Sequence, residues 1–71
     1  MNTHDMTPDV EQLKRQYIQA VVDVKTAFRC QMSRDSLERL MDRQQHLRAK
    51  LVAAHVGILE IIGLEQEARG K

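Results

Sequence analysis

The segment from Leu51 to Leu64, LVAAHVGILEIIGL, constrains the fold more than any other part of the 71-residue chain. Only His55 and Glu60 within it are strongly polar. A helix that faces water needs a single apolar stripe, whereas a helix over this segment is apolar around most of its circumference. One packing neighbour cannot cover such a helix, so the segment predicts a surface for a further partner.

Length and composition limit what the chain can be. A chain of 71 residues forms one domain, and so small a core is marginal without help from a partner. Eleven Lys and Arg residues against ten Asp and Glu residues give no strong field toward nucleic acid or an anionic membrane. Cys30 is the single cysteine, which excludes an internal disulfide and fits a reducing compartment.

The sequence also indicates where in the cell the protein resides. The polar N-terminus MNTHDMTPD lacks the cationic and apolar regions of a secretory signal. The apolar run is shorter than the roughly 20 residues that a membrane span needs. We therefore expect a cytoplasmic protein without a membrane span.

The first helix is predicted over residues 8–31, after a disordered stretch at residues 1–6. Thr7 can cap the helix, Pro8 fits the first helical position, and Asp9 complements the helix dipole. Apolar residues then recur with alternating three- and four-residue spacing, at Val10, Leu13, Tyr17, Ala20, Val24 and Ala27.

The second helix is predicted over residues 34–64. The stretch CQMSRDS interrupts the apolar pattern, and Ser33 or Asp35 can cap the helix that follows. The heptad phase then continues without a break, through Leu37, Leu40, Gln44, Leu47, Leu51, Ala54, Ile58 and Ile61. The predicted fold is all-α: an antiparallel, coiled-coil-like two-helix hairpin in one domain over residues 7–66, with a frayed C-terminus at 67–71.

The register of this hairpin predicts a binding surface. With the turn near residue 33, Leu13 lies near Ala53, and the end of the second helix extends past the first. Exposed aliphatic residues of this kind mark an interface, and those of the tail are Ile58, Leu59, Ile61, Ile62 and Leu64. Ile18 and Val22 lie off the main stripe of the first helix, and the small residues Ala53 and Gly57 allow another helix to approach closely; all four join the predicted partner-binding set.

Residues for catalysis or metal binding are not arranged in any motif. His46 and His55 are nine residues apart, unlike the four-residue pair of a helical metal site. Cys30 has no cysteine or histidine partner nearby. We expect no enzyme activity, no cofactor and no metal.

The pattern of the chain resembles a known family. It is carried by Leu13 to Gln16 and Ala20 to Val22 in the first helix, Gln44, Gln45 and Leu47 in the second, and Gly57 to Ile62 near the end. These residues, on two helices with a short central break, are similar to the YscE-like co-chaperones of the type III secretion needle subunit. The resemblance implies a bacterial cytoplasmic virulence protein that docks on a larger helical-repeat chaperone and keeps the needle subunit monomeric. Homodimerisation is the expected fallback when that partner is absent.

Two alternatives remain open at this point. One is a self-associating adaptor or scaffold protein whose homodimer forms a four-helix bundle. The other is a small nucleic-acid-binding regulator, which would use the basic residues of the second helix, Arg39, Arg43, Arg48 and Lys50.

Overall fold

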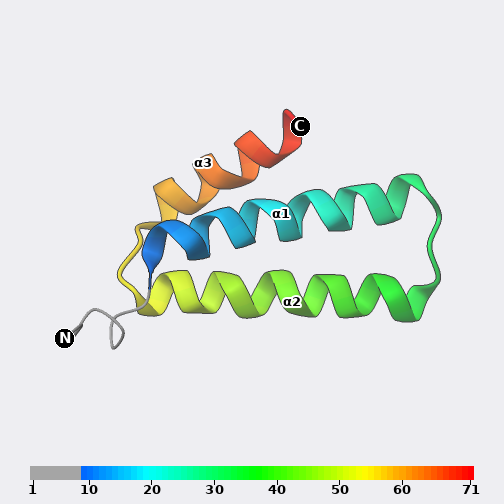
Figure 1. Ribbon diagram of the computed structural model, residues 1–71, viewed down its shortest axis with the longest axis horizontal. Coiled ribbons are helices and arrows are strands. Elements are labelled where there is room, and N and C mark those ends of the chain that lie inside the picture. The colour runs from blue at the N-terminus through cyan, green and yellow to red at the C-terminus, as the bar shows by residue number, and fades with distance from the viewer. Residues whose placement is uncertain (1–8) are drawn as a thin grey trace.

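The computed structural model describes residues 9–71, which form three α-helices: α1 (Val10–Arg29), α2 (Arg34–Ala53) and α3 (Ile58–Arg69). Helices α1 and α2 are antiparallel, and α3 turns back to run beside α1 in the same direction (Figure 1). The described residues are thus all-helical, but the predicted two-helix hairpin is wrong. The region expected to be one helix over 34–64 consists of α2, a turn and α3.

Helix α1 begins with a side-chain cap. The carboxylate of Asp9 accepts a hydrogen bond from the backbone N–H of Gln12 at 3.2 Å, which satisfies one of the free donors of the first turn. The stretch expected to be disordered, the predicted capping residue Thr7 and the predicted first helical residue Pro8 lie outside the described residues. Helix α1 ends at Arg29, two residues before the predicted end.

The turn between α1 and α2, residues 30–33, closes with a Schellman motif. The N–H of Met32 donates to the carbonyl of Ala27 at 3.1 Å, and that of Gln31 to the carbonyl of Phe28 at 3.3 Å. Gln31 has a φ of 54°, in the left-handed region. Glycine is the residue that usually occupies this position of the motif. Ser33 then caps α2 by accepting from the N–H of Ser36, as one of the two predicted capping residues.

The turn between α2 and α3, residues 54–57, repeats this backbone pattern. The N–H of Val56 donates to the carbonyl of Leu51 at 3.0 Å, and that of His55 to the carbonyl of Val52 at 3.0 Å. His55, with φ of 66°, holds the left-handed position that Gln31 holds in the first turn. Gly57 precedes α3 without any side-chain cap. A tight turn can therefore form here without proline or a polar capping side chain, and this is why the sequence pattern did not reveal it.

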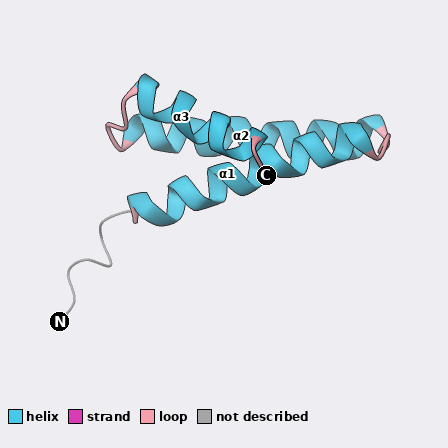
Figure 2. Ribbon diagram, turned by 90° about the horizontal axis from the view of Figure 1, so that it is seen from above, coloured by secondary structure: helices cyan, strands magenta, loops and turns pink. Residues whose placement is uncertain are grey.

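The core lies where all three helices meet. Each helix contributes one large, fully buried side chain: Tyr17 from α1, Leu51 from α2 and Ile61 from α3. Figure 2 shows α1 to one side of both α2 and α3 at the end that holds the α2–α3 turn. The buried cluster consists of Tyr17, Ala20, Leu47, Leu51, Val56 and Ile61. The fold-back of α3 thus gives this small chain a core that a hairpin alone lacks.

The hairpin register agrees with the prediction as far as the end of α2. Leu13 and Ala53 line the same groove between the start of α1 and the end of α2. The tail, however, does not extend past α1. Helix α3 also continues through residues 67–69, which were expected to fray, because Ala68 is fully buried and the last turn contacts α1.

Candidate protein-binding surface

Helix α3 has an inner side that packs against the rest of the chain. Ile61 and Ala68 are fully buried, while Leu64 and Glu65 are partly buried. The spacing of these four residues, three and four apart, places them on one side of the helix. Most of the apolar area on the opposite flank consequently has no neighbour within the chain.

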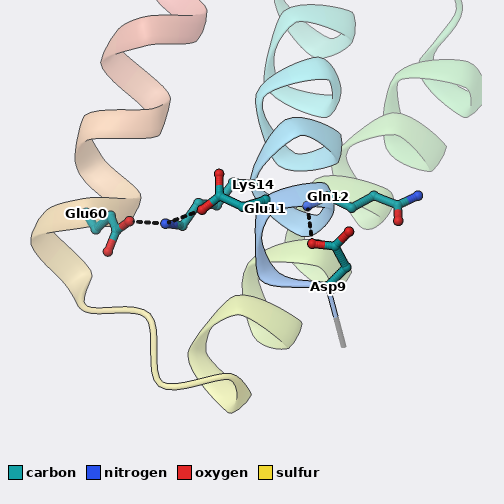
Figure 3. Close-up of polar contacts among 5 residues, drawn as sticks. All are labelled: Asp9, Glu11, Gln12, Lys14 and Glu60. Atoms are coloured by element: carbon teal, nitrogen blue, oxygen red, sulfur yellow. Dashed lines mark hydrogen bonds and ion pairs between the residues drawn. The ribbon is translucent and has the colours of Figure 1, made fainter. Parts of the chain in front are cut away.

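Two lysines of α1 hold α3 at both ends. Lys14 forms an ion pair with Glu60 in the first turn of α3, and a second one with Glu11 at 3.5 Å (Figure 3). The Nζ of Lys25 donates to the carbonyl oxygens of Ala68 at 3.4 Å and Arg69 at 3.0 Å. A cation at the C-terminal carbonyls of a helix also complements the helix dipole. These contacts fix the position of α3 along α1.

The face of α1 between these two lysines carries apolar residues because α3 packs against it. Lys14, Ile18, Val22 and Lys25 follow one another at spacings of four, four and three, which places them on one face of α1. All four side chains are partly buried, and both lysines contact α3. Ile18 and Val22, predicted to bind a partner, therefore lie on the face of α1 that α3 covers.

A buried tyrosine links α1 to α3 in the middle of the core. The hydroxyl of Tyr17 donates to Oε2 of Glu65 at 2.5 Å, so the polar end of this fully buried side chain is satisfied. Burial, followed by the hydrogen bond to Glu65, raises the pKa of Tyr17. A hydrogen bond with Glu60 is the main reason that the pKa of Lys14 is also raised. Both groups therefore keep their protons in the folded chain at neutral pH.

The outer flank of α3 is apolar and exposed. Ile58, Leu59 and Ile62 are 53%, 81% and 41% exposed, and their spacing places them side by side on the helix. We call these three residues the outer α3 surface. Because α3 is held at both ends, this surface is presented in a fixed orientation.

Gly63 lies next to this surface, in the interior of α3. A glycine inside a helix costs about 0.8–1 kcal/mol relative to alanine. A Cβ atom at Gly63 would meet nothing within 4 Å, so the packing of the chain itself does not require a glycine here. A close approach by another molecule would account for it.

The predicted partner-binding residues thus fall into three groups. Those of the outer α3 surface are exposed, as are Ala53 and Gly57. Leu64 is partly buried against the core. The α3-facing pair on α1, Ile18 and Val22, is also partly buried. Ile61, in contrast, is fully buried, so it cannot reach a partner while α3 stays folded back.

A second exposed apolar region lies at the opposite end of the hairpin. Phe28, Met32 and Met41 are 61%, 46% and 41% exposed, because the twelve residues of α3 do not extend over this end. Sequence reasoning did not single out these residues as exposed. The shortness of α3 produces this exposure, and no local pattern around these residues reports it.

A groove of about 450 Å³ lies between the start of α1 and the end of α2. Helical spacing places its α1 residues on the side of that helix opposite to the α3-facing lysines. Its lining is Asp9, Gln12, Leu13, Gln16, Lys50, Ala53 and Ala54. Its mixed lining shows no converging catalytic groups.

The other candidate groups are dispersed. Within residues 9–71, no cluster of three or more His, Cys, Asp and Glu side chains could hold a metal ion. His46, His55 and Cys30 are all exposed and separate. Of the basic residues considered for phosphate, Arg43 pairs with Asp23 on α1 at 3.8 Å. None of the helices in this range has the length and apolar character to cross a membrane.

Comparison with known proteins gave no significant match to a family model, a curated protein or a solved structure.

Proposed function

We propose that this chain is a protein-interaction module that presents the outer α3 surface to an α-helical surface of another protein. The observation that carries the proposal is the exposure of Leu59, at 81%, next to two further exposed isoleucines on a helix fixed at both ends. Burying an aliphatic side chain of this size stabilises a complex by roughly 1.5–3 kcal/mol. Three such residues form the apolar centre of a small interface.

The form of the surface favours a helix as the docking element. Ile62 lies four residues after Ile58 and three after Leu59, and these are the spacings with which an amphipathic helix anchors itself in an apolar groove. Gly63 beside them leaves room for the backbone of a partner helix. The lysine contacts supply rigidity, so little conformational entropy is lost on docking.

The specific form of this proposal is the role implied by the family resemblance. In that role the chain is a bacterial cytoplasmic co-chaperone that docks on a larger helical-repeat chaperone and helps to keep a type III secretion needle subunit monomeric. What supports it is an aliphatic C-terminal region with an exposed flank. The three-helix arrangement shifts the predicted contact set from the whole tail to the outer α3 surface, and the role requires neither catalysis nor a cofactor.

The test compares two matched exposed positions. Leu59→Asp removes the centre of the outer α3 surface, whereas Phe28→Asp places the same charge on a similarly exposed residue of α1, at 61%. Tagged parent and variants are purified from the native cytosol, and the copurifying chain is identified and weighed by light scattering. Affinities are then measured with the purified partner.

We expect the parent and the Phe28→Asp variant to retain one helical partner in a stoichiometric complex. The Leu59→Asp variant should bind it at least about thirtyfold more weakly, the lower limit for an interface hot spot. Unchanged helicity by circular dichroism would show that Leu59→Asp leaves the fold intact. Equal affinity of both variants, or a partner without helical structure, would overturn the proposal.

A further inference from the structure

We infer that two copies of this chain can exchange α3, so that α3 of each copy packs on α1 of the other. The occupant of the α3-facing side of α1 is then the same segment from a second copy. This inference concerns the inner side of α3 and the α2–α3 turn, and it does not depend on the function proposed for the outer α3 surface.

The α2–α3 turn is built in a way that allows it to open into a helix. Residues 54–57 contain no proline, which would prevent a continuous helix. His55 occupies the left-handed region, with φ of 66°, where a residue with a Cβ atom is strained. Gly57 gives α3 no side-chain cap. Extending α2 through the turn removes the strained residue and gives the backbone groups helical partners.

The apolar pattern also fits a continuous helix. Leu47, Leu51, Ala54, Ile58 and Ile61 keep one heptad phase across the turn, so an uninterrupted helix over α2 and α3 still carries a single apolar stripe. The chain therefore encodes two arrangements of the same segments. The folded-back arrangement buries Ile61 of this stripe within one chain, whereas the extended one needs a second chain to cover it.

The contacts of α3 with α1 can form equally well between chains. They are the ion pair of Lys14 with Glu60, the hydrogen bond of Tyr17 to Glu65, and the hydrogen bonds from Lys25 to the last carbonyls of α3. None of them requires that α1 and α3 belong to the same chain. Exchange preserves them all; what changes is the turn, including the packing of Val56 against the core.

The directions of the helices permit a closed dimer. Within one chain α3 runs parallel to α1, and α2 runs antiparallel to it (Figure 1). Two extended chains related by a two-fold axis have antiparallel long helices, which places α3 of each beside α1 of the other in the parallel sense. Such exchange is a known route from a monomer to a symmetric dimer.

The test uses two charge-reversed variants, Lys14→Glu and Glu60→Lys. Each variant alone places like charges together, whether α3 folds back or is exchanged between identical chains. A mixed, exchanged dimer restores attraction at both sites: the two substituted side chains, from different chains, meet with opposite charges at one site, and the native pair forms at the other. One variant is labelled with ¹⁵N, the two are mixed, warmed and cooled, and the dimers are weighed by native mass spectrometry.

We expect the mixture to contain more dimer than either variant alone at the same total concentration, with mixed dimers well above the statistical half. Statistical mixing would show that the copies associate through another surface and would overturn the inference. Absence of dimer in the mixture at millimolar concentration would overturn it as well.

The turn supplies an independent check. His55→Ala keeps the strain of the folded-back turn and favours the helix, so it should increase the dimer fraction over the parent. His55→Gly relieves that strain and should decrease it. Because His55 is exposed, neither change removes a packed side chain. The same dimer fraction in both variants would contradict the role assigned to the turn.

Discussion

The α1–α2 turn and the α2–α3 turn share one backbone design but differ in what anchors them. Both close with the same pair of hydrogen bonds and place a non-glycine residue in the left-handed region. The first turn has a polar cap, Ser33, and an exposed apolar residue, Met32, at 46%. The second lacks a side-chain cap, but its corresponding residue, Val56, is 9% exposed and belongs to the core.

A tight helical turn can therefore be fixed either by a local cap or by packing against the core. Local polar chemistry fixes the first turn, whereas tertiary packing fixes the second. In a Schellman motif the residue after the left-handed position commonly contacts the helix it leaves, and Val56 does so within the cluster that contains Leu51. The α2–α3 turn should therefore depend on the core, and the α1–α2 turn should not.

The largest difference between the two turns is expected when the apolar residue of each is truncated to alanine. Val56→Ala removes two buried methyl groups, so it should lower the free energy of unfolding by about 1.5–2.5 kcal/mol. Met32→Ala acts at an exposed position and should change it by less than about 0.5 kcal/mol. Urea denaturation followed by circular dichroism measures both. Equal losses would show that packing does not distinguish the two turns.

An intermediate effect on stability is expected from substitutions that relieve the backbone strain at the two left-handed residues. Gln31→Gly and His55→Gly remove a strain of about 1–2 kcal/mol, offset by about 0.5–1 kcal/mol of glycine flexibility. Each should raise the stability of the monomer by about 0.5–1 kcal/mol, since the two φ angles, 54° and 66°, are similar. Alanine at the same positions is the control, because it keeps the strain. Destabilisation by glycine at either turn would contradict the motif assigned to it.

A smaller effect is expected from exchanging the caps. Gly57→Ser gives α3 a side-chain acceptor, and its Cβ meets nothing within 4 Å; Ser33→Gly removes the acceptor of α2. The first change should raise the free energy of unfolding by a few tenths of a kcal/mol and the second should lower it by a similar amount. Thermal unfolding of both variants and of the double variant measures this. A loss of stability in Gly57→Ser would show that the start of α3 differs from the one described.

The smallest effect on the free energy of unfolding is expected from the titratable contacts of α3, and it appears only at alkaline pH. The pKa values of Tyr17 and Lys14 are raised by folding, so the stability they contribute is present below their unfolded values, near about 10, and is lost as the pH rises through the folded values. The free energy of unfolding should therefore stay level up to about pH 9–10 and fall above it. Tyr17→Phe should remove the tyrosine part of this fall, and an unchanged alkaline slope in that variant would contradict the contact with Glu65.

The sequence predicted the parts of the fold that rest on local signals. The apolar spacing located α1, and Ser33 marked the start of α2. The second turn was missed because His55 and Val56 are not helix breakers and because the heptad phase from Leu51 to Ile58 runs through it. The signal that could have revealed α3 lies on α1, where the α1–α2 hairpin leaves one face uncovered. Its residues are Lys14, Ile18, Val22 and Lys25.

The same reason decides how much of the candidate surface could be predicted. Ile58, Leu59 and Ile62 were expected to be exposed, and they are. Ile61 was grouped with them because all of them are aliphatic residues of one tail. Which side of this tail faces inward depends on the direction in which α3 leaves the turn, and that direction is set by packing on α1 rather than by residues near Ile61.

In the monomer α3 folds back onto α1, and a distance measured between the ends of these two helices can test this arrangement. Spin labels at Thr26 and Arg69, with Cys30→Ser to remove the native thiol, are measured by double electron–electron resonance in a sample shown to be monomeric by light scattering. The folded-back arrangement predicts a separation of about 20 Å or less, the spacing of neighbouring helices plus the label arms. A separation of about 40 Å, as an uninterrupted helix over residues 34–69 requires, would contradict it.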